Sequence, residues 1–172
     1  MPVIKLTATG SVLNDADKSA IVAQLNKELQ SPTDDGPVIF EIPLSGEGKF
    51  DVLVVWEKWK EKAVPAQTRS DMILAAYGDK KNKIALPQGV TYQEAIEQNL
   101  LPYAVIPMAR KNEVSAELLK ASMKKYGAFT LPGEKVDLRL PTIELASDIH
   151  KKLVDELPKA YWSIAQSIGP VE

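Results

Sequence analysis

The sequence predicts an α/β or α+β fold, in which a mixed β-sheet is covered by helices and the chain ends in C-terminal helices. Short apolar or alternating segments, typical of strands, recur between segments with apolar residues every three or four positions, typical of amphipathic helices. The first elements follow the order β-α-β-β-α. With 172 residues and no long linker, we expect one globular domain, residues 1–172, in which residues 142–172 could form a helical C-terminal appendage.

The first half of the chain is predicted to begin with a strand, a helix and a two-stranded hairpin. Residues 3–9 alternate apolar and polar side chains, as in a half-buried strand. Residues 15–30 form an amphipathic helix, because Ile21, Leu25 and Leu29 are four apart. Strands follow at 37–44 and 50–56, joined by a short loop with two glycines. The second of these is almost continuously apolar, which predicts burial on both faces.

The middle of the chain is predicted to contain two helices and a short strand. Residues 65–78 begin with a proline and end at a glycine, as helices often do. A charged loop over 79–83 and a short strand at 84–86 follow. Thr91 and Glu94 have the spacing of a capping box, which predicts a helix from residue 92.

The last third is predicted to alternate strands and helices and to finish with helices. The expected elements are a strand at 103–108, a helix at 114–126, two short strands around Pro132–Gly133, a long helix from Thr142, and a final short helix at 160–169. Pro158 separates the last two helices.

Composition argues against several classes of function. The net charge is −2 and only three of the 21 basic residues are arginine, which disfavours nucleic-acid binding. There is no cysteine, which excludes disulfides, thiolate catalysis and Cys-ligated metal sites. The start of the chain lacks the pattern of a signal peptide, and no apolar stretch approaches the ~18 residues of a membrane span. We therefore expect no membrane contact, no cofactor or metal, and the cytoplasm as location.

Catalytic side chains are scarce. The single histidine, His150, lies on the predicted long helix beside Ile149, and no G-x-S-x-G motif is present. Asp51 interrupts the apolar strand at 50–56. Its carboxylate is either buried with a shifted pKa, as catalytic carboxylates often are, or placed at the wet end of the strand next to the hairpin.

Pro2 is the second candidate catalytic residue. Removal of Met1 would expose a proline amine at the start of a strand, which is followed by a helix. This layout resembles the N-terminus of the tautomerase superfamily, in which the amino-terminal proline opens a β-α-β unit and acts as a base. The resemblance covers about thirty residues and implies a base at Pro2. The chain departs from the family pattern after that point, with a hairpin and no matching arginine.

Aromatic residues give the candidate binding surface. Trp56 and Trp59 follow the apolar strand within the charged segment WEKWKEK. A helical segment would place both rings on one side, whereas an extended one would place them on opposite faces. One interpretation is ordinary packing at the end of the strand. The other is a partner or ligand surface comprising Trp56, Trp59, Tyr77 and Trp162, since Trp and Tyr are enriched in interface hot spots.

These observations together favour a non-catalytic module for protein interaction or self-association. Its partner would be another protein or a second copy of the chain. The alternative is a small-molecule enzyme or binding protein, of which a tautomerase-like use of Pro2 is the most concrete form.

Overall fold

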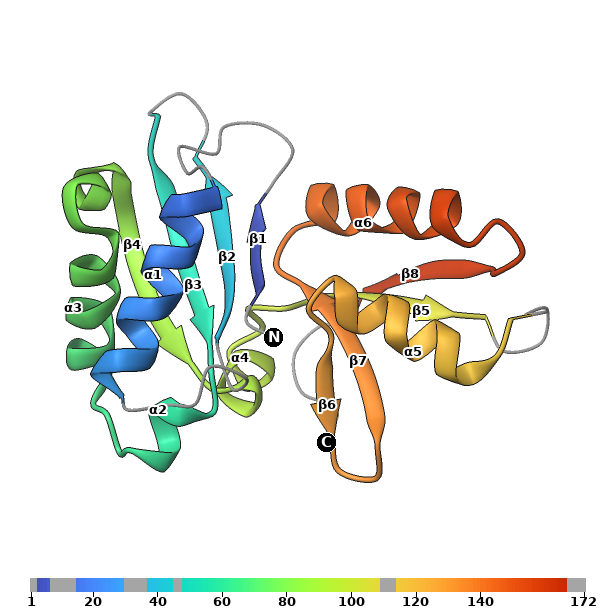
Figure 1. Cartoon of the computed structure of the whole chain (residues 1–172), viewed down its shortest axis with the longest axis horizontal. Coiled ribbons are helices and arrows are strands. Elements are labelled where there is room, and N and C mark those ends of the chain that lie inside the picture. Colours follow the sequence, from blue (N-terminus) through green and yellow to red (C-terminus); the bar gives the residue numbers. More distant parts are fainter. Residues whose placement is uncertain (1–2, 7–14, 30–36, 45–47, 109–113, 167–172) are drawn as a thin grey trace. The chain divides into compact units, whose positions relative to one another are not determined.

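The computed structural model describes residues 3–6, 15–29, 37–44, 48–108 and 114–166, and confirms the predicted α+β class (Figure 1). The chain divides into two compact units, Met1–Ala95 and Ile96–Glu172. Each unit has its own four-stranded sheet, where the sequence suggested one sheet. The expectation of a single domain over residues 1–172 stays a prediction.

The N-terminal sheet has the strand order β1-β2-β3-β4. Its strands are β1 (Val3–Leu6), β2 (Val38–Pro43), β3 (Phe50–Val55) and β4 (Ile84–Val90). β1 is parallel to β2, β2 is antiparallel to β3, and β3 is parallel to β4. The sheet thus consists of two β-α-β units joined by the predicted β2–β3 hairpin. Pro43 lies at the end of β2, where its missing N–H costs no ladder bond.

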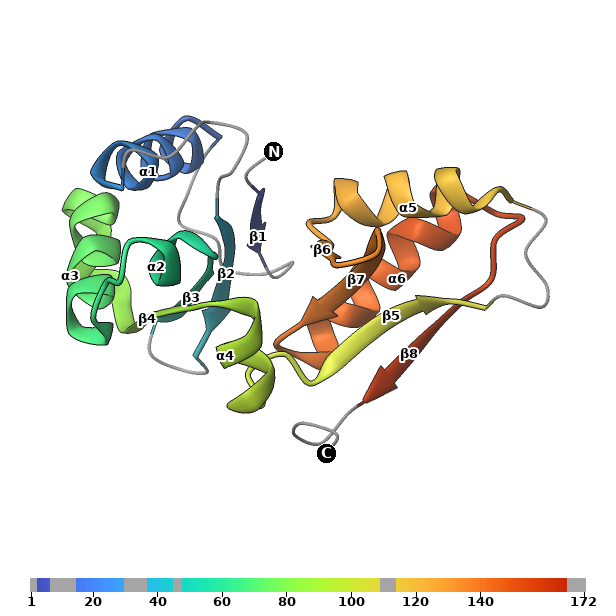
Figure 2. The ribbon, with the colours of Figure 1, turned by 90° about the horizontal axis from the view of Figure 1, so that it is seen from below.

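Helices α1 (Asp15–Glu28) and α3 (Ala66–Tyr77) cover one face of this sheet (Figure 2). Ile21 and Leu25 of α1 and Ile73 of α3 share one buried cluster with Ile39 and Val54 of the sheet. The strand residues in this cluster have alternating positions because successive side chains of a strand point to opposite faces. β3 is buried along both faces, as its continuous apolar run predicts.

Three short elements lie between or after the strands of this unit. α2 (Lys58–Glu61) is a single turn between β3 and α3. A 3-10 helix, η2 (Gly78–Lys83), replaces the predicted loop before β4. α4 (Tyr92–Glu97) begins with the predicted capping box: the Thr91 hydroxyl accepts from the Glu94 N–H at 3.2 Å, and Glu94 Oε1 accepts from the Thr91 N–H at 3.0 Å.

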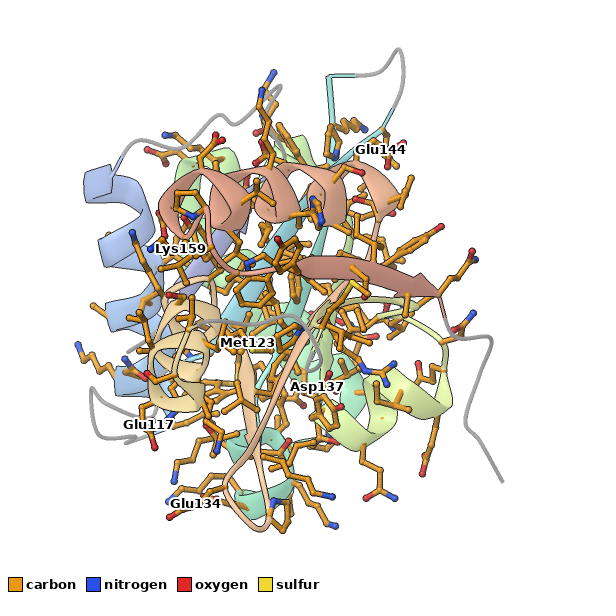
Figure 3. The ribbon with its side chains drawn as sticks, turned by 90° about the vertical axis from the view of Figure 1, so that its right-hand side faces the viewer. Glu117, Met123, Glu134, Asp137, Glu144 and Lys159 are labelled. Carbon is orange, nitrogen blue, oxygen red and sulfur yellow. The ribbon has the colours of Figure 1, made fainter. Side chains whose placement is uncertain are left out.

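The C-terminal sheet is antiparallel throughout and has the order β6-β7-β5-β8. Its strands are β5 (Tyr103–Pro107), β6 (Phe129–Leu131), β7 (Lys135–Leu140) and β8 (Trp162–Gln166). Helices α5 (Ala116–Lys125) and α6 (Ile143–Glu156) lie on one side of it (Figure 2). Figure 3 shows Met123 of α5 in the middle of this unit, with Glu117 and Glu134 towards its rim.

The predicted final helix over residues 160–169 is wrong in the described part, because residues 162–166 form strand β8. α6 ends at Glu156, before Pro158, as expected. The segment after it pairs with β5 over its whole length, from Trp162 opposite Pro107 to Gln166 opposite Tyr103. A short apolar segment fits a helix and a strand almost equally well, so pairing with a distant strand decided the outcome.

Gly89 of β4 lies so close to its neighbours that a side chain there would collide with them. A Cβ atom added there would lie 2.9 Å from the Arg69 Cβ and 3.0 Å from Cε2 of the Trp59 ring. We expect Gly89→Ala to lower the free energy of unfolding by about 1–3 kcal/mol, the usual cost of overpacking. Urea denaturation measures this loss. Thr68→Ala, at an exposed position of α3, is the control and should change stability by less than about 0.5 kcal/mol. Equal stability of the two variants would contradict the packing.

Candidate interaction surface

The two tryptophans of the WEKWKEK segment lie in the core of the N-terminal unit. Both belong to the buried cluster between the sheet and its helices, and the Trp59 side chain has no exposed area. Their rings meet edge to face, with centroids 5.4 Å apart. Trp59 Nε1 donates to the Val54 carbonyl at 3.2 Å. The segment turns helical at α2, so both rings lie on one side, and the packing interpretation describes this site.

Arg69 joins three separate segments next to Trp59. Its Nε donates to the Val64 carbonyl at 2.7 Å, and its Nη1 donates to the Gly89 carbonyl at 3.2 Å. Nη1 also pairs with Glu94 Oε1 at 2.9 Å. The Arg69 side chain is only 12% exposed, so these bonds replace the water that a guanidinium would otherwise bind. Because its fork satisfies two buried carbonyls and one carboxylate, this arginine has a structural role.

Glu94 is the carboxylate of this network and occupies position N3, the last residue of the capping box. Burial by itself raises its pKa, but the Thr91 N–H, the Arg69 guanidinium and the Thr91 hydroxyl together hold the pKa below its ordinary value. A second carboxylate also bonds to the backbone at the start of α4: Glu57 Oε1 accepts from the Tyr92 N–H at 2.9 Å. Both acidic residues therefore fix the start of α4.

Tyr77 of α3, the third predicted surface residue, is also buried. Its hydroxyl donates to Oε1 of the buried Glu41 at 2.8 Å. Burial, the negative charge of Glu41 and this hydrogen bond raise the pKa of Tyr77 far above its ordinary value. The phenol therefore stays protonated at any physiological pH and serves as the donor that Glu41 needs in the core.

Of the two candidate catalytic residues, Asp51 is within the described residues and Pro2 is not. Asp51 is half-buried on β3, where burial raises its pKa and a hydrogen bond from the Leu86 N–H acts in the opposite direction. It therefore lies between the two predicted environments, and a catalytic role for it stays a prediction. Pro2 lies outside the described residues, so the tautomerase-like base also stays a prediction. β1, α1 and the parallel β2 do form the β-α-β unit that the resemblance implies.

Trp162, the fourth predicted surface residue, is buried in the C-terminal unit. It lies on the helix-covered face of the sheet, together with Val105, Leu138 and Leu140. Its indole N–H has no acceptor among the described residues. Its backbone carbonyl accepts a hydrogen bond from Nε2 of the partly buried His150, at 3.0 Å. Because a carbonyl can only accept, the proton of this bond is on Nε2.

The opposite, outer face of the C-terminal sheet carries exposed apolar side chains. Ile106, Met108 and Tyr161 are 43%, 46% and 50% exposed, and we call them the Tyr161 patch. Ile106 lies opposite Ser163, and the Met108 N–H donates to the Tyr161 carbonyl at 2.8 Å, which continues the β5–β8 ladder by one pair. Alternation along the strands therefore places all three side chains on the face away from Trp162.

Only a partial signal for this patch is present in the sequence. Tyr161 and Trp162 are neighbours in the sequence, and the predicted surface included Trp162. In a strand, however, adjacent residues point to opposite faces, so one of the two had to be buried. A strand assignment for residues 162–166, with Trp162 assigned to the core, would have indicated Tyr161 and the alternate residues of β5.

Comparisons with family models, with curated proteins and with solved structures found no match to this chain. Within the described ranges, no helix is long and apolar enough to cross a membrane. The same residues contain no group of three or more His, Asp or Glu side chains placed to hold a metal ion. The Tyr161 patch is therefore the feature from which a function is argued.

Arg69→Lys tests the network in the N-terminal unit. Lysine keeps the charge but lacks the fork, so the Val64 and Gly89 carbonyls lose donors. We expect a loss of about 2 kcal/mol in the free energy of unfolding, measured by urea denaturation. The matched control is Arg139→Lys, where the lysine can remake the partly exposed ion pair with Asp137, and the loss should be less than half as large. A larger loss in the control would contradict the assigned role.

Glu94→Gln tests the charge of the same network through pH. Glutamine can keep the capping box but cannot pair with Arg69 as an anion. Because the pKa of folded Glu94 is below 4.5, its ordinary value, ionised Glu94 stabilises the fold above that pH. The contribution is lost as the pH falls through the folded pKa. Denaturation from pH 7 to 3 should show wild type more stable than the variant at pH 7, with the difference shrinking below about 4.5. A difference that is independent of pH would contradict this assignment.

Proposed function

We propose that this protein is a non-catalytic module that binds another protein through the outer face of its C-terminal sheet. The observation that supports the proposal is the Tyr161 patch. Among the described residues, seven large apolar side chains are exposed, and three of them lie on this face, Ile106 within β5 and the paired Met108 and Tyr161 directly beyond the ends of β5 and β8. Single exposed apolar residues are common on protein surfaces, but neighbouring ones often mark contact sites.

The composition of the patch fits a protein partner. Tyrosine and methionine are enriched in the cores of protein interfaces, and Ile106 adds a branched apolar side chain two positions before Met108 on the same face. Ser163 and Ala165, which continue this face along β8, are small and leave room for side chains of a partner. Arg139 and Asp137 lie on the same face and pair with each other at 2.8 Å, so they supply polar groups at the border.

The rigid base of the patch also favours binding. β5 pairs with β8 along its whole length and with β7 over Tyr103–Val105, so Ile106 pairs with β8 and directly follows the doubly paired part of the strand. α5 and α6 support the sheet from the other face through buried residues such as Leu119 and Leu153. A partner therefore meets side chains that are already positioned, which lowers the entropy lost on association.

Two variants at position 161 test this function, one that identifies the partner and one that weakens its binding. A photoreactive phenylalanine analogue at position 161 should cross-link the protein to its partner in cells, whereas the same analogue at the exposed position 117 of α5 should not. With the captured partner purified, Tyr161→Ser should weaken binding about tenfold or more, as hot-spot residues do. Its thermal midpoint should stay near that of wild type, because the side chain is half exposed.

Leu118→Ser is the matched control for this experiment. Leu118 is 46% exposed, as apolar residues of the patch are, but it lies on α5. Its replacement should leave binding unchanged. The proposal fails if Leu118→Ser weakens the complex as much as Tyr161→Ser does, or if position 161 captures nothing beyond what position 117 captures.

A further inference from the structure

The edge strands of the two sheets differ in how their outward backbone groups are treated. An edge strand presents N–H and C=O groups that can pair with another strand, and proteins usually block them. In the N-terminal sheet, the outward carbonyls of β4 are taken by side chains of α3. Ser70 Oγ donates to the Pro87 carbonyl at 2.9 Å, and Arg69 Nη1 donates to the Gly89 carbonyl. Pro87 itself has no N–H to offer.

Two further edges carry other protections. β1 has only four residues, so its edge is short. β6 has three residues and is followed by Pro132, so its edge is short. The remaining edge is β8, which pairs only with β5 among the described strands.

The register of β8 shows which of its backbone groups point outward. The Met108 N–H donates to the Tyr161 carbonyl, so Tyr161, and by alternation Ser163 and Ala165, direct their backbone groups towards β5. The backbone groups of Trp162, Ile164 and Gln166 then point away from β5. The Nε2 of His150 donates to the Trp162 carbonyl, and the outward backbone groups of Ile164 and Gln166 make no hydrogen bond to other described residues.

The sequence of this edge lacks the usual blocking residues. Residues 160–166 read AYWSIAQ and contain no charged residue and no proline. An uncharged, alternating strand with open backbone groups is the kind of edge to which another strand adds. A second copy is the partner that fits best, because it brings the same uncharged strand, and the net charge of −2 produces little repulsion between copies.

We propose that two copies of this chain pair through their β8 strands, antiparallel about a twofold axis at Ile164. Ile164 then lies opposite Ile164 of the second copy, and the two exchange both backbone hydrogen bonds. Ser163 lies opposite Ala165, and Trp162 lies opposite Gln166. The two sheets become one continuous sheet, in which both outer faces point to the same side. This pairing goes beyond the proposed function, which needs one copy only.

Ile164→Pro is the first test. Its N–H points away from β5, so proline removes an intermolecular donor and leaves the β5–β8 ladder intact. Sedimentation velocity of wild type should show the mass rising from one chain to two with concentration. Ile164→Pro should remain at the mass of one chain, with an unchanged far-ultraviolet circular dichroism spectrum. Tyr161→Ser, a change on the outer face, should dimerise like wild type. A wild type that stays monomeric at all concentrations would overturn the pairing.

Ile164→Cys is the second test, and it does not depend on how the proline variant folds. The chain has no cysteine, so a single one reports contacts between copies without background. Paired residues at this position have Cα atoms about 5.5 Å apart, within the range of a disulfide. Mild oxidation should therefore link most of Ile164→Cys into dimers. Thr130→Cys, at an exposed position of β6, should stay largely unlinked. Equal linkage in the two variants would overturn the proposal, and binding of a partner at Tyr161 would be unaffected by that result.

Discussion

The contacts of one arginine hold the N-terminal unit together. Arg69 on α3 bonds to the segment after α2, to the edge strand β4 and to the start of α4, and it lies against the buried Trp59. A guanidinium can satisfy several carbonyls at once and never loses its charge, which explains why arginine occupies this position. Gly89 then has to be glycine, because a larger residue would collide with Arg69 and Trp59.

Local sequence signals predicted most of the elements, because their physical causes are local. The Thr91–Glu94 capping box, the helix with Ile21 and Leu25, and the buried strand at 50–55 all follow from spacing within a few residues. The Arg69 network could not be predicted in this way. Its partners are 20 and 25 residues away, and only the folded sheet brings them together. The division into two sheets depends on strand pairing of the same long range.

The candidate site shows the same limit. Residues 160–166 have an apolar content that fits a helix or a strand, and the strand is selected by β5, more than fifty residues earlier in the chain. That choice decides the surface, since it buries Trp162 and exposes Tyr161. Tryptophan was the better candidate by residue type, but the large apolar area that makes it a strong contact residue also favours its burial in the core of the fold. The sequence identified the segment and could not identify the face.

The edge strands of the two sheets differ in how their outward backbone groups are bonded. In the N-terminal unit, the side chains of Ser70 and Arg69 donate hydrogen bonds to outward carbonyls of β4. The aromatic residues that the sequence suggested as a surface in this unit are buried in its core. In the C-terminal unit, His150 closes only the first outward carbonyl of β8, and apolar side chains of β5 and its neighbour remain exposed on the outer face. The proposed binding at the outer face and at the β8 edge uses two modes, side-chain packing and strand addition. We therefore expect contact with other chains in the described residues of the C-terminal unit, 96–108 and 114–166.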